Sequence, residues 1–185
     1  MMLLGNKIIV VGCPGSGKSV FSRKLQESTG LPLFHLDNIW WNDDRTHISR
    51  EEFDCRLSQI LATDKWIIDG YYSRTFEVRA SACDTIIFLD YSEETCMDGI
   101  LRRIGTERPD IPWVENQLDP ELVQLVRDFH REKRQVLYAL MEQYPEKQAI
   151  IFKTRDEADQ WVSVLQNQMM GALGCDHSRG IINET

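Results

Sequence analysis

The segment Gly12-Cys13-Pro14-Gly15-Ser16-Gly17-Lys18-Ser19 constrains the fold of this 185-residue chain more than any other feature. It has the pattern GxxxxGKS, and it lies between the apolar run Lys7–Val11 and a stretch of helical period, Val20–Ser28. Glycines let the backbone approach an anion closely, and successive N–H groups at the start of a helix point toward it. The pattern therefore predicts a strand, a phosphate-binding loop and a helix in direct succession.

Each part of this loop has an expected role. The backbone from Gly12 to Ser19 would cradle the phosphates of ATP, Lys18 would reach the β and γ phosphates, and the Ser19 hydroxyl would ligate Mg²⁺. Cys13 is either a thiol of low pKa near a helix N-terminus or a small side chain that the loop tolerates. A guanine-binding [NT]KxD pattern does not fit the end of the last predicted strand, where the sequence is FKTRD. A small phosphotransferase fits better than a GTP switch or a large motor ATPase.

The rest of the chain predicts an α/β fold with a largely parallel sheet, because short apolar runs alternate with stretches of helical period. The five expected strands are Lys7–Val11, Leu33–Leu36, Trp66–Asp69, Thr85–Asp90 and Ala149–Phe152. Ser49–Glu52 and Thr154–Glu157 have the capping-box pattern that begins a helix. Asp119 and Pro120 predict a helix start, and that helix is expected to run to about Tyr144.

The length and the lack of a linker predict one domain, residues 1–168. Within it, the aperiodic segment Gly105–Asp119 contains two prolines and is expected to be a lid, since loops of this length are often functional. The stretch Met169–Thr185 is aperiodic and is expected to fray.

The amino-acid composition limits the binding partners that we expect and the cellular compartment in which we expect the protein. The 21 basic and 29 acidic residues give a net charge of −8, so direct binding to nucleic acid is not expected. The five cysteines form no CxxC pair and the four histidines form no recognisable ligand set, which argues against disulfides and structural zinc. With no apolar run long enough for a membrane span, we expect a cytoplasmic protein, as a monomer or homodimer.

Polar residues at the expected strand ends are candidates for binding magnesium and a phosphoryl acceptor. Asp37 could orient the acceptor and Trp40 could stack on it, although Asp37 could equally cap a turn and the tryptophan could belong to the core. Asp69 is placed to hold Mg²⁺ through water, and Arg74 to grip an acceptor anion. In and beside the lid, Arg103 and Arg108 are candidates for stabilising the transferred phosphoryl group, the alternative being ordinary ion pairs.

The ordered motifs give the chain a wider resemblance. The segments that carry the resemblance are, in this order, GCPGSGKS, HLDNIWW, KWIIDGYYSRT, CDTIIFLDY, LRRIG, FHREKR and AIIFKTRDEADQWV. Through them the chain resembles the adenylate-kinase-related proteins labelled DNA topology modulation proteins. The resemblance implies a three-layer P-loop NTPase fold with a five-stranded parallel sheet, a short lid, and ATP with Mg²⁺. It departs from the DGFPR motif of adenylate kinases, because Arg74 comes one residue later.

The motifs and the resemblance together predict a kinase of the nucleoside-monophosphate-kinase type that transfers the γ-phosphate of ATP to a small acceptor. Two alternatives remain open. One is a small-metabolite kinase of the shikimate or gluconate kinase type. The other is a regulator without enzymatic activity that binds ATP and affects DNA topology indirectly.

Overall fold

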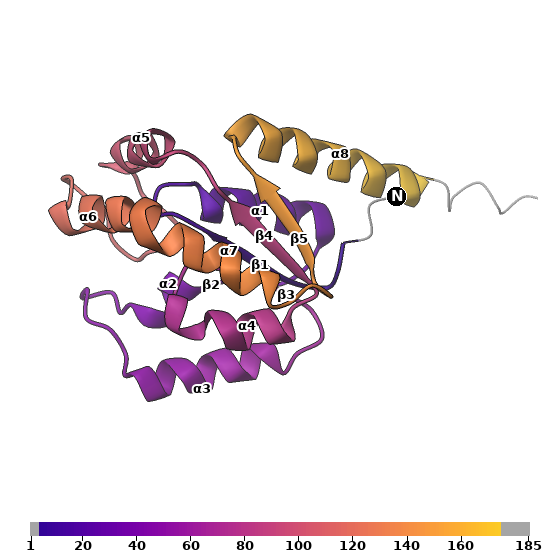
Figure 1. The fold of residues 1–185 in the computed structure, drawn as a ribbon, viewed down its shortest axis with the longest axis horizontal. Helices are drawn as coiled ribbons and strands as arrows, with labels where there is room; N and C mark the ends of the chain where they lie inside the picture. The colour runs from indigo at the N-terminus through magenta and orange to yellow at the C-terminus, as the bar shows by residue number, and fades with distance from the viewer. Residues whose placement is uncertain (1–3, 175–185) are drawn as a thin grey trace, which may run out of the picture.

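The computed structural model describes residues 4–174 and shows one parallel sheet of five strands in the order β2-β3-β1-β4-β5 (Figure 1). The strands are β1 (Lys7–Gly12), β2 (Leu33–His35), β3 (Trp66–Asp69), β4 (Thr85–Leu89) and β5 (Gln148–Phe152). Every residue of β3 and β4 is buried, which explains why these segments are apolar on both faces. The predicted fold class and all five strands are confirmed.

Helices follow the strands and cover both faces of the sheet. They are α1 (Lys18–Thr29), α2 (Leu36–Trp40), α3 (Arg50–Leu61), α4 (Phe76–Ala82), α5 (Glu93–Arg103), α6 (Pro120–Asp128), α7 (Arg134–Glu142) and α8 (Arg155–Gly174). A 3-10 turn, η1, spans Ser73–Thr75, and a π-helical segment, η2, spans Phe129–Lys133. In Figure 1, α7 crosses in front of the strands and α1 lies behind them.

The predicted caps form as expected. The Ser49 hydroxyl accepts a hydrogen bond from the Glu52 N–H at 3.1 Å, and the Thr154 hydroxyl accepts one from Glu157 at 3.2 Å. Asp119 caps α6, which continues through η2 into α7 and ends at Glu142. The helix predicted to begin at Asp119 therefore exists, with a π-helical turn in its middle.

Two boundaries differ from the expectation. The backbone turns into α2 at Leu36, so β2 ends at His35 and Asp37 lies in the first turn of a short helix. At the other end, α8 continues to Gly174, so the beginning of the stretch expected to fray is helical, and the remainder lies outside the described residues. Over residues 4–174, no helix combines the length and hydropathy that a bilayer span requires.

Candidate active site

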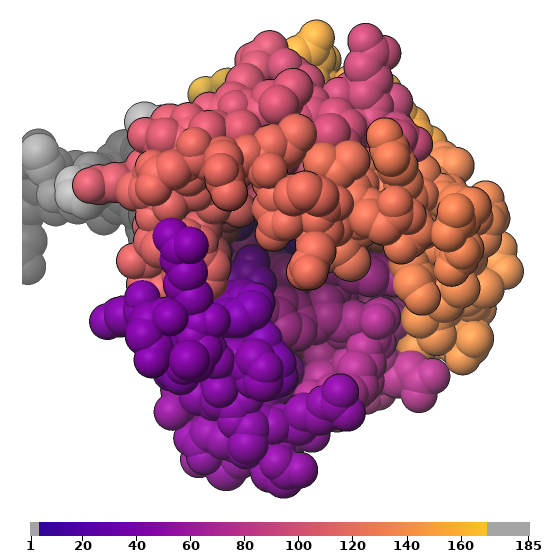
Figure 2. All heavy atoms as spheres, turned by 90° about the vertical axis from the view of Figure 1, so that its left-hand side faces the viewer, coloured from indigo at the N-terminus to yellow at the C-terminus, as the bar shows by residue number. Residues whose placement is uncertain are grey.

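A cleft of about 1470 Å³ lies at the carboxyl edge of the sheet, where the segments that follow the strands meet. Its lining includes the loop after β1, Asp37 after β2, Gly70–Ser73 after β3, Tyr91 after β4 and Arg155 after β5. Residues of the segment Gly105–Asp119, which is predicted to be a lid, line one side of the cleft. Figure 2 shows the hollow between the N-terminal third of the chain and the segment that contains the lid and α6. The parallel topology thus gathers residues that are far apart in sequence.

The phosphate-binding loop has the geometry that its sequence predicts. Gly17 is the N-cap of α1 with a φ of +86°, a conformation that disfavours residues with a side chain. Gly15 packs so tightly that a Cβ there would lie 2.0 Å from the carbonyl oxygen of Cys96. Lys18 folds back over the loop and donates to the carbonyl oxygens of Gly12 and Cys13, at 3.1 and 3.0 Å. The ammonium group is therefore held beside the open end of the loop.

Two oxygen donors next to the loop fit a magnesium ion. The Ser19 hydroxyl stands at the start of α1, and Asp69 ends β3, the strand beside β1. One oxygen of the buried Asp69 carboxylate, Oδ1, bonds to His35 Nδ1 at 2.8 Å. The other, Oδ2, is buried and has no hydrogen-bond partner among the described residues, so it is available to a ligand, although Asp69 itself is not part of the cleft lining. Hard oxygen donors are the ligands that Mg²⁺ prefers.

His35 holds the Asp69 carboxylate in place. Burial acts to lower the pKa of His35, but the hydrogen bond and the charge of Asp69 outweigh it and raise that pKa. The side chains of both residues are almost completely buried. The pair fixes one oxygen of Asp69 and leaves the other for a ligand.

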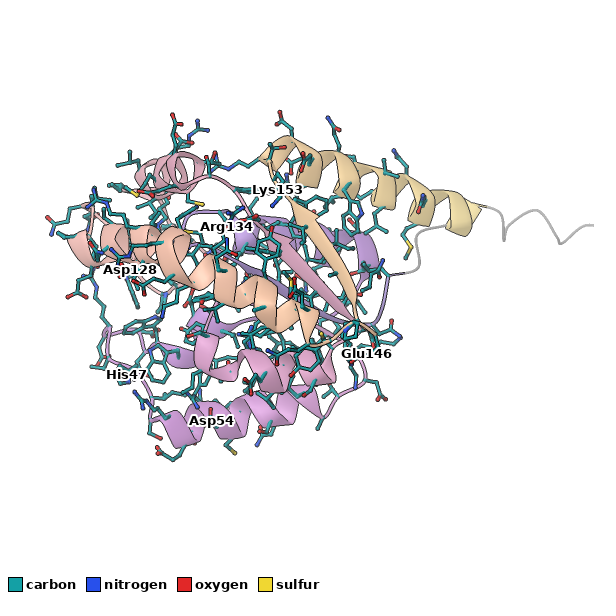
Figure 3. The ribbon with its side chains drawn as sticks, viewed as in Figure 1. His47, Asp54, Asp128, Arg134, Glu146 and Lys153 are labelled. Carbon is teal, nitrogen blue, oxygen red and sulfur yellow. The ribbon has the colours of Figure 1, made fainter. Side chains whose placement is uncertain are left out.

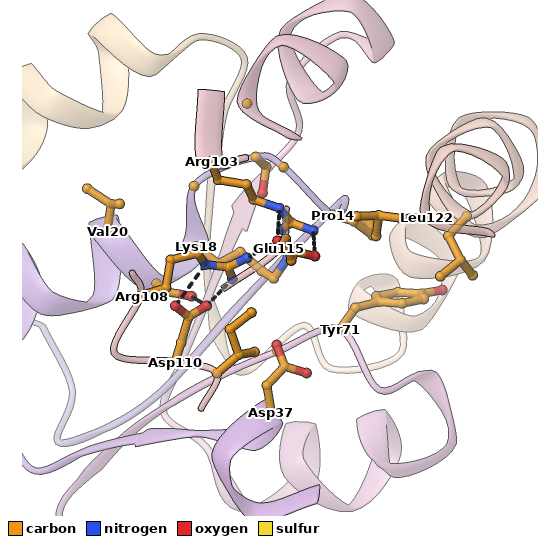
Figure 4. Close-up of a pocket in the computed structure, with 18 of the residues that line it drawn as sticks. Pro14, Lys18, Val20, Asp37, Tyr71, Arg103, Arg108, Asp110, Glu115 and Leu122 are labelled. Carbon is orange, nitrogen blue, oxygen red and sulfur yellow. Dashed lines mark hydrogen bonds and ion pairs between the residues drawn. The ribbon is translucent and has the colours of Figure 1, made fainter. Parts of the chain in front are cut away.

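A second carboxylate beside the loop, Asp110 of the segment Gly105–Asp119, was not singled out from the sequence. Its Oδ2 accepts a hydrogen bond from the Ser19 hydroxyl at 2.7 Å and an ion pair from Arg108 (Figure 4). Arg108 and Ser19 lower the pKa of Asp110 to about 2 against the effect of its burial. Asp110 thus occupies the position beside Ser19 where a phosphate or a metal would bind. Nothing in the local pattern marks it, because 91 residues separate the two partners.

The arginines of the lid region face the cleft, but acids already pair with them. Arg103 Nη2 donates to Glu115 Oε1 at 3.0 Å, and Arg108 Nη1 donates to Glu115 Oε2 at 3.0 Å. Figure 4 shows these groups meeting above Lys18. The structure therefore brings the two predicted arginines together at the loop, and each would have to exchange an acid for a phosphate oxygen.

The acceptor side of the cleft is aromatic around one carboxylate. Asp37 accepts a hydrogen bond from the Tyr72 hydroxyl at 2.8 Å. Burial raises the pKa of Asp37, and the bond from Tyr72 opposes that rise. Trp40 lines the cleft and also packs on its neighbours, with ring centroids 4.4 Å from His47 and 5.5 Å from Phe53. It thus serves as both cleft wall and core.

Arg74, predicted to bind an acceptor anion, lies outside the cleft. Its guanidinium binds both oxygens of Asp54 on α3, at 2.6 and 2.9 Å, and it is not part of the cleft lining. Figure 3 shows Asp54 on α3, the helix at the bottom of that view. In this arrangement Arg74 cannot grip an acceptor in the cleft, because η1 directs its side chain to α3 instead.

A buried arginine that the sequence did not reveal shapes the same loop. Arg79 of α4 is fully buried and donates to the carbonyl oxygens of Gly70, Tyr71, Tyr72 and Thr75. Burial lowers its pKa to about 10. By fixing the loop after β3, Arg79 positions Tyr72 beside Asp37.

No protein-family model matches the chain, and no curated protein matches it in sequence. Its structure is similar to that of a shikimate kinase from Acinetobacter baumannii in complex with shikimate, with a TM-score of 0.57 and 15% identity over 96% of both chains. A shikimate kinase from Bacteroides thetaiotaomicron has a TM-score of 0.54 at 16% identity, covering 88% of this chain and 97% of its own. For a gluconokinase from Sinorhizobium meliloti the TM-score is 0.52 at 14% identity, with 97% and 100% covered. The chain has the α/β fold of these P-loop kinases.

Proposed function

We propose that this protein is a Mg²⁺-dependent kinase that transfers the γ-phosphate of ATP to a hydroxyl group of a small acceptor. One observation carries the proposal: the phosphate-binding loop and the Asp37 carboxylate line the same cleft. A phosphate donor and a group that can take a proton from an acceptor are the two components that phosphoryl transfer needs. The similarity to P-loop kinases supports this reading at the level of the fold.

Each residue then has a defined task. Lys18 exchanges its bonds to Gly12 and Cys13 for oxygens of the β and γ phosphates. Arg103 and Arg108 turn from their acids to the transferred group and stabilise its charge. Asp37 accepts the proton of the acceptor hydroxyl. Ser19 and Asp69 would hold Mg²⁺, which when bound neutralises charge on the β and γ phosphates.

The acceptor side favours a hydroxylated small metabolite over a nucleoside monophosphate. An acceptor phosphate needs a cation that is free to bind it. Arg74, the cation predicted for that purpose, is paired with Asp54 outside the cleft. What faces the acceptor is the Asp37 carboxylate among aromatic rings, together with Arg45, whose guanidinium would suit an acceptor carboxylate. This favours the small-metabolite alternative, whereas the family named in the resemblance stays a prediction.

The test is an assay for ATP-dependent phosphorylation with a panel of hydroxylated metabolites, nucleosides and nucleoside monophosphates. We expect turnover with a hydroxylated metabolite. Lys18→Ala should abolish turnover and weaken ATP binding, whereas Lys65→Ala, at an exposed position before β3, should change neither. Unchanged ATP affinity in Lys18→Ala would contradict the assignment of the loop. Tight ATP binding without turnover on any acceptor would instead favour the nucleotide-dependent regulator.

A further inference from the structure

Two cysteines and a histidine from three different elements meet beneath the phosphate-binding loop. Cys13 belongs to the loop, Cys96 to α5 and His130 to the π-helical segment η2. One ligand atom of each side chain lies within 4.8 Å of the others, and Cys13 Sγ is 3.9 Å from His130 Nδ1. Both cysteines are fully buried, and none of the three residues lines the cleft. The three side chains therefore lie outside the cleft, on the far side of a loop that Cys13 shares with the proposed phosphotransfer site.

The hydrogen bonds of His130 leave Nδ1 available to the two cysteines. Nδ1 lies 2.9 Å from the carbonyl oxygen of Val126 and 3.9 Å from Cys13 Sγ, and Nε2 lies 3.0 Å from the carbonyl oxygen of Tyr91. A neutral imidazole carries one N–H, so when Nε2 donates to Tyr91 the lone pair of Nδ1 accepts from the Cys13 thiol or binds a cation in its place. Histidines that bind metals commonly donate their second N–H to a backbone carbonyl in this way.

The carbonyl oxygen of Val126 does not depend on His130. It also accepts from the backbone N–H of Phe129 at the end of α6. Releasing the imidazole to a metal would therefore leave no unpaired backbone oxygen. The π-helical turn that contains His130 also fits a functional role, because such turns inside α-helices frequently mark functional sites.

We propose that Cys13, Cys96 and His130 bind one thiophilic divalent cation of the zinc class. With Zn–S near 2.3 Å and Zn–N near 2.0–2.1 Å, two ligand atoms on a tetrahedral ion lie about 3.5–3.8 Å apart. The 3.9 Å separation of Cys13 Sγ and His130 Nδ1 is close to this range, and the other separations, within 4.8 Å, would have to shorten when the ion binds. Three protein ligands leave the fourth position for water or hydroxide, as in open zinc sites.

Charge and ligand type support the choice of cation. Two thiolates and a neutral imidazole exactly offset the charge of a divalent ion, so the buried site would carry no net charge. Binding would release the two thiol protons to solvent. Thiolate and imidazole are soft or borderline ligands that favour zinc, whereas magnesium prefers oxygen. The cation would tie the phosphate-binding loop to α5 and η2 without taking part in the magnesium site at Ser19 and Asp69.

The experiment titrates the full-length, reduced protein with Co²⁺, whose absorbance reports tetrahedral thiolate coordination, and then displaces it with Zn²⁺. We expect one equivalent to bind the wild type, with loss of the thiolate signal in Cys96→Ala and a weaker signal in His130→Gln. Cys55→Ala, which removes an exposed cysteine, and Cys175→Ala are the matched controls and should bind as the wild type does. Zn²⁺ should also raise the melting temperature of the wild type and of these two controls only.

Three results would overturn the proposal: no Co²⁺ or Zn²⁺ binding by the wild type, undiminished binding in Cys96→Ala, or loss of binding in Cys55→Ala. Circular dichroism of each variant shows whether it folds, and His130→Gln decides the question if Cys96→Ala does not. Because metal binding is measured without ATP, the outcome is independent of the proposed kinase activity.

Discussion

At the scale of single residues, the most unexpected contact is the lid carboxylate on the hydroxyl of the phosphate-binding loop. Asp110 competes with a nucleotide for both Ser19 and Arg108. A hydrogen bond to a charged group contributes roughly 1.5–3 kcal/mol, and 1.4 kcal/mol corresponds to a tenfold change in affinity. Removing the negative charge of Asp110 should therefore strengthen the binding of ATP.

We expect Asp110→Asn to tighten ATP binding in the absence of metal by about tenfold, because both partners are released for the phosphates. A fluorescence titration with ATP measures the dissociation constant. Asp54→Asn, which removes the exposed partner of Arg74, is the matched control and should leave that constant unchanged. Weaker ATP binding in Asp110→Asn would show that the carboxylate assists the nucleotide instead.

Asp37 yields a prediction about pH. Burial raises the pKa of its carboxyl group, so Asp37 should lose its proton and act as a base only at pH values above those at which carboxyl groups usually ionise. Turnover should therefore rise as the pH passes through this raised pKa. Asp37→Asn should lower kcat by roughly 10²–10⁴-fold without changing ATP affinity. Tyr72→Phe removes the bond that lowers this pKa, so the acid limb of the profile should move to higher pH. A profile that does not move would mean that Asp37 is not the base.

At the scale of elements, one buried carboxylate joins the end of β4 to α7 and to the start of the β5–α8 connection. Asp90 binds both Nε and Nη2 of Arg134, at 2.5 and 2.7 Å, and accepts from the Tyr138 hydroxyl at 2.6 Å and from Lys153 Nζ at 2.5 Å. Arg134 belongs to α7 and Lys153 follows β5, and Figure 3 shows the two residues near each other. These donors outweigh the effect of burial and lower the pKa of Asp90 to about 2.

Asp90→Asn should destabilise the protein by about 2 kcal/mol at pH 7, because it leaves two cations without their counter-ion. A depressed pKa stabilises the fold at pH values above the pKa of the unfolded chain, and that stabilisation is lost as pH falls toward the folded value. The difference in unfolding free energy should therefore shrink between about pH 4 and pH 2. Urea denaturation at several pH values measures it, and Asp64→Asn, at an exposed loop position, is the control. A difference that stays constant with pH would contradict this account.

At the scale of the whole molecule, the sheet and the phosphate-binding loop were predictable because their signals are local. A motif such as Gly12–Ser19 specifies its own backbone, and buried parallel strands are short apolar runs. The side-chain contacts between segments far apart in sequence were not predictable in the same way. Ser19 with Asp110, Arg74 with Asp54, and the Cys13 cluster with His130 each join segments whose proximity follows only from the tertiary fold.

The segment Gly105–Asp119, predicted to be a lid, also contacts the segment that follows β2. The Asn38 side chain donates to the carbonyl oxygen of Pro109 at 2.9 Å, and the rings of Trp41 and Trp113 meet edge to face with centroids 5.5 Å apart. Together with the Asp110–Ser19 bond, these contacts join the segment to both sides of the cleft. A kinase needs contacts that exclude water from its cleft, because water that reaches the γ-phosphate competes with the acceptor.

Trp113→Ala should therefore raise the rate of ATP hydrolysis without acceptor relative to the rate of phosphoryl transfer. The substitution removes the lid's ring from Trp41 and also from Arg45, whose guanidinium lies 5.7 Å from the centre of that ring. Leu118→Ala, at an exposed position of the same segment, is the control. It tests whether shortening any apolar side chain there raises the ratio of ATP hydrolysis to phosphoryl transfer. Phosphate release and product formation, measured in parallel, give the ratio. If the ratio rises equally in both variants or in neither, the contact between Trp41 and Trp113 does not exclude water, and closure must depend on the polar contacts at Ser19 and Asn38.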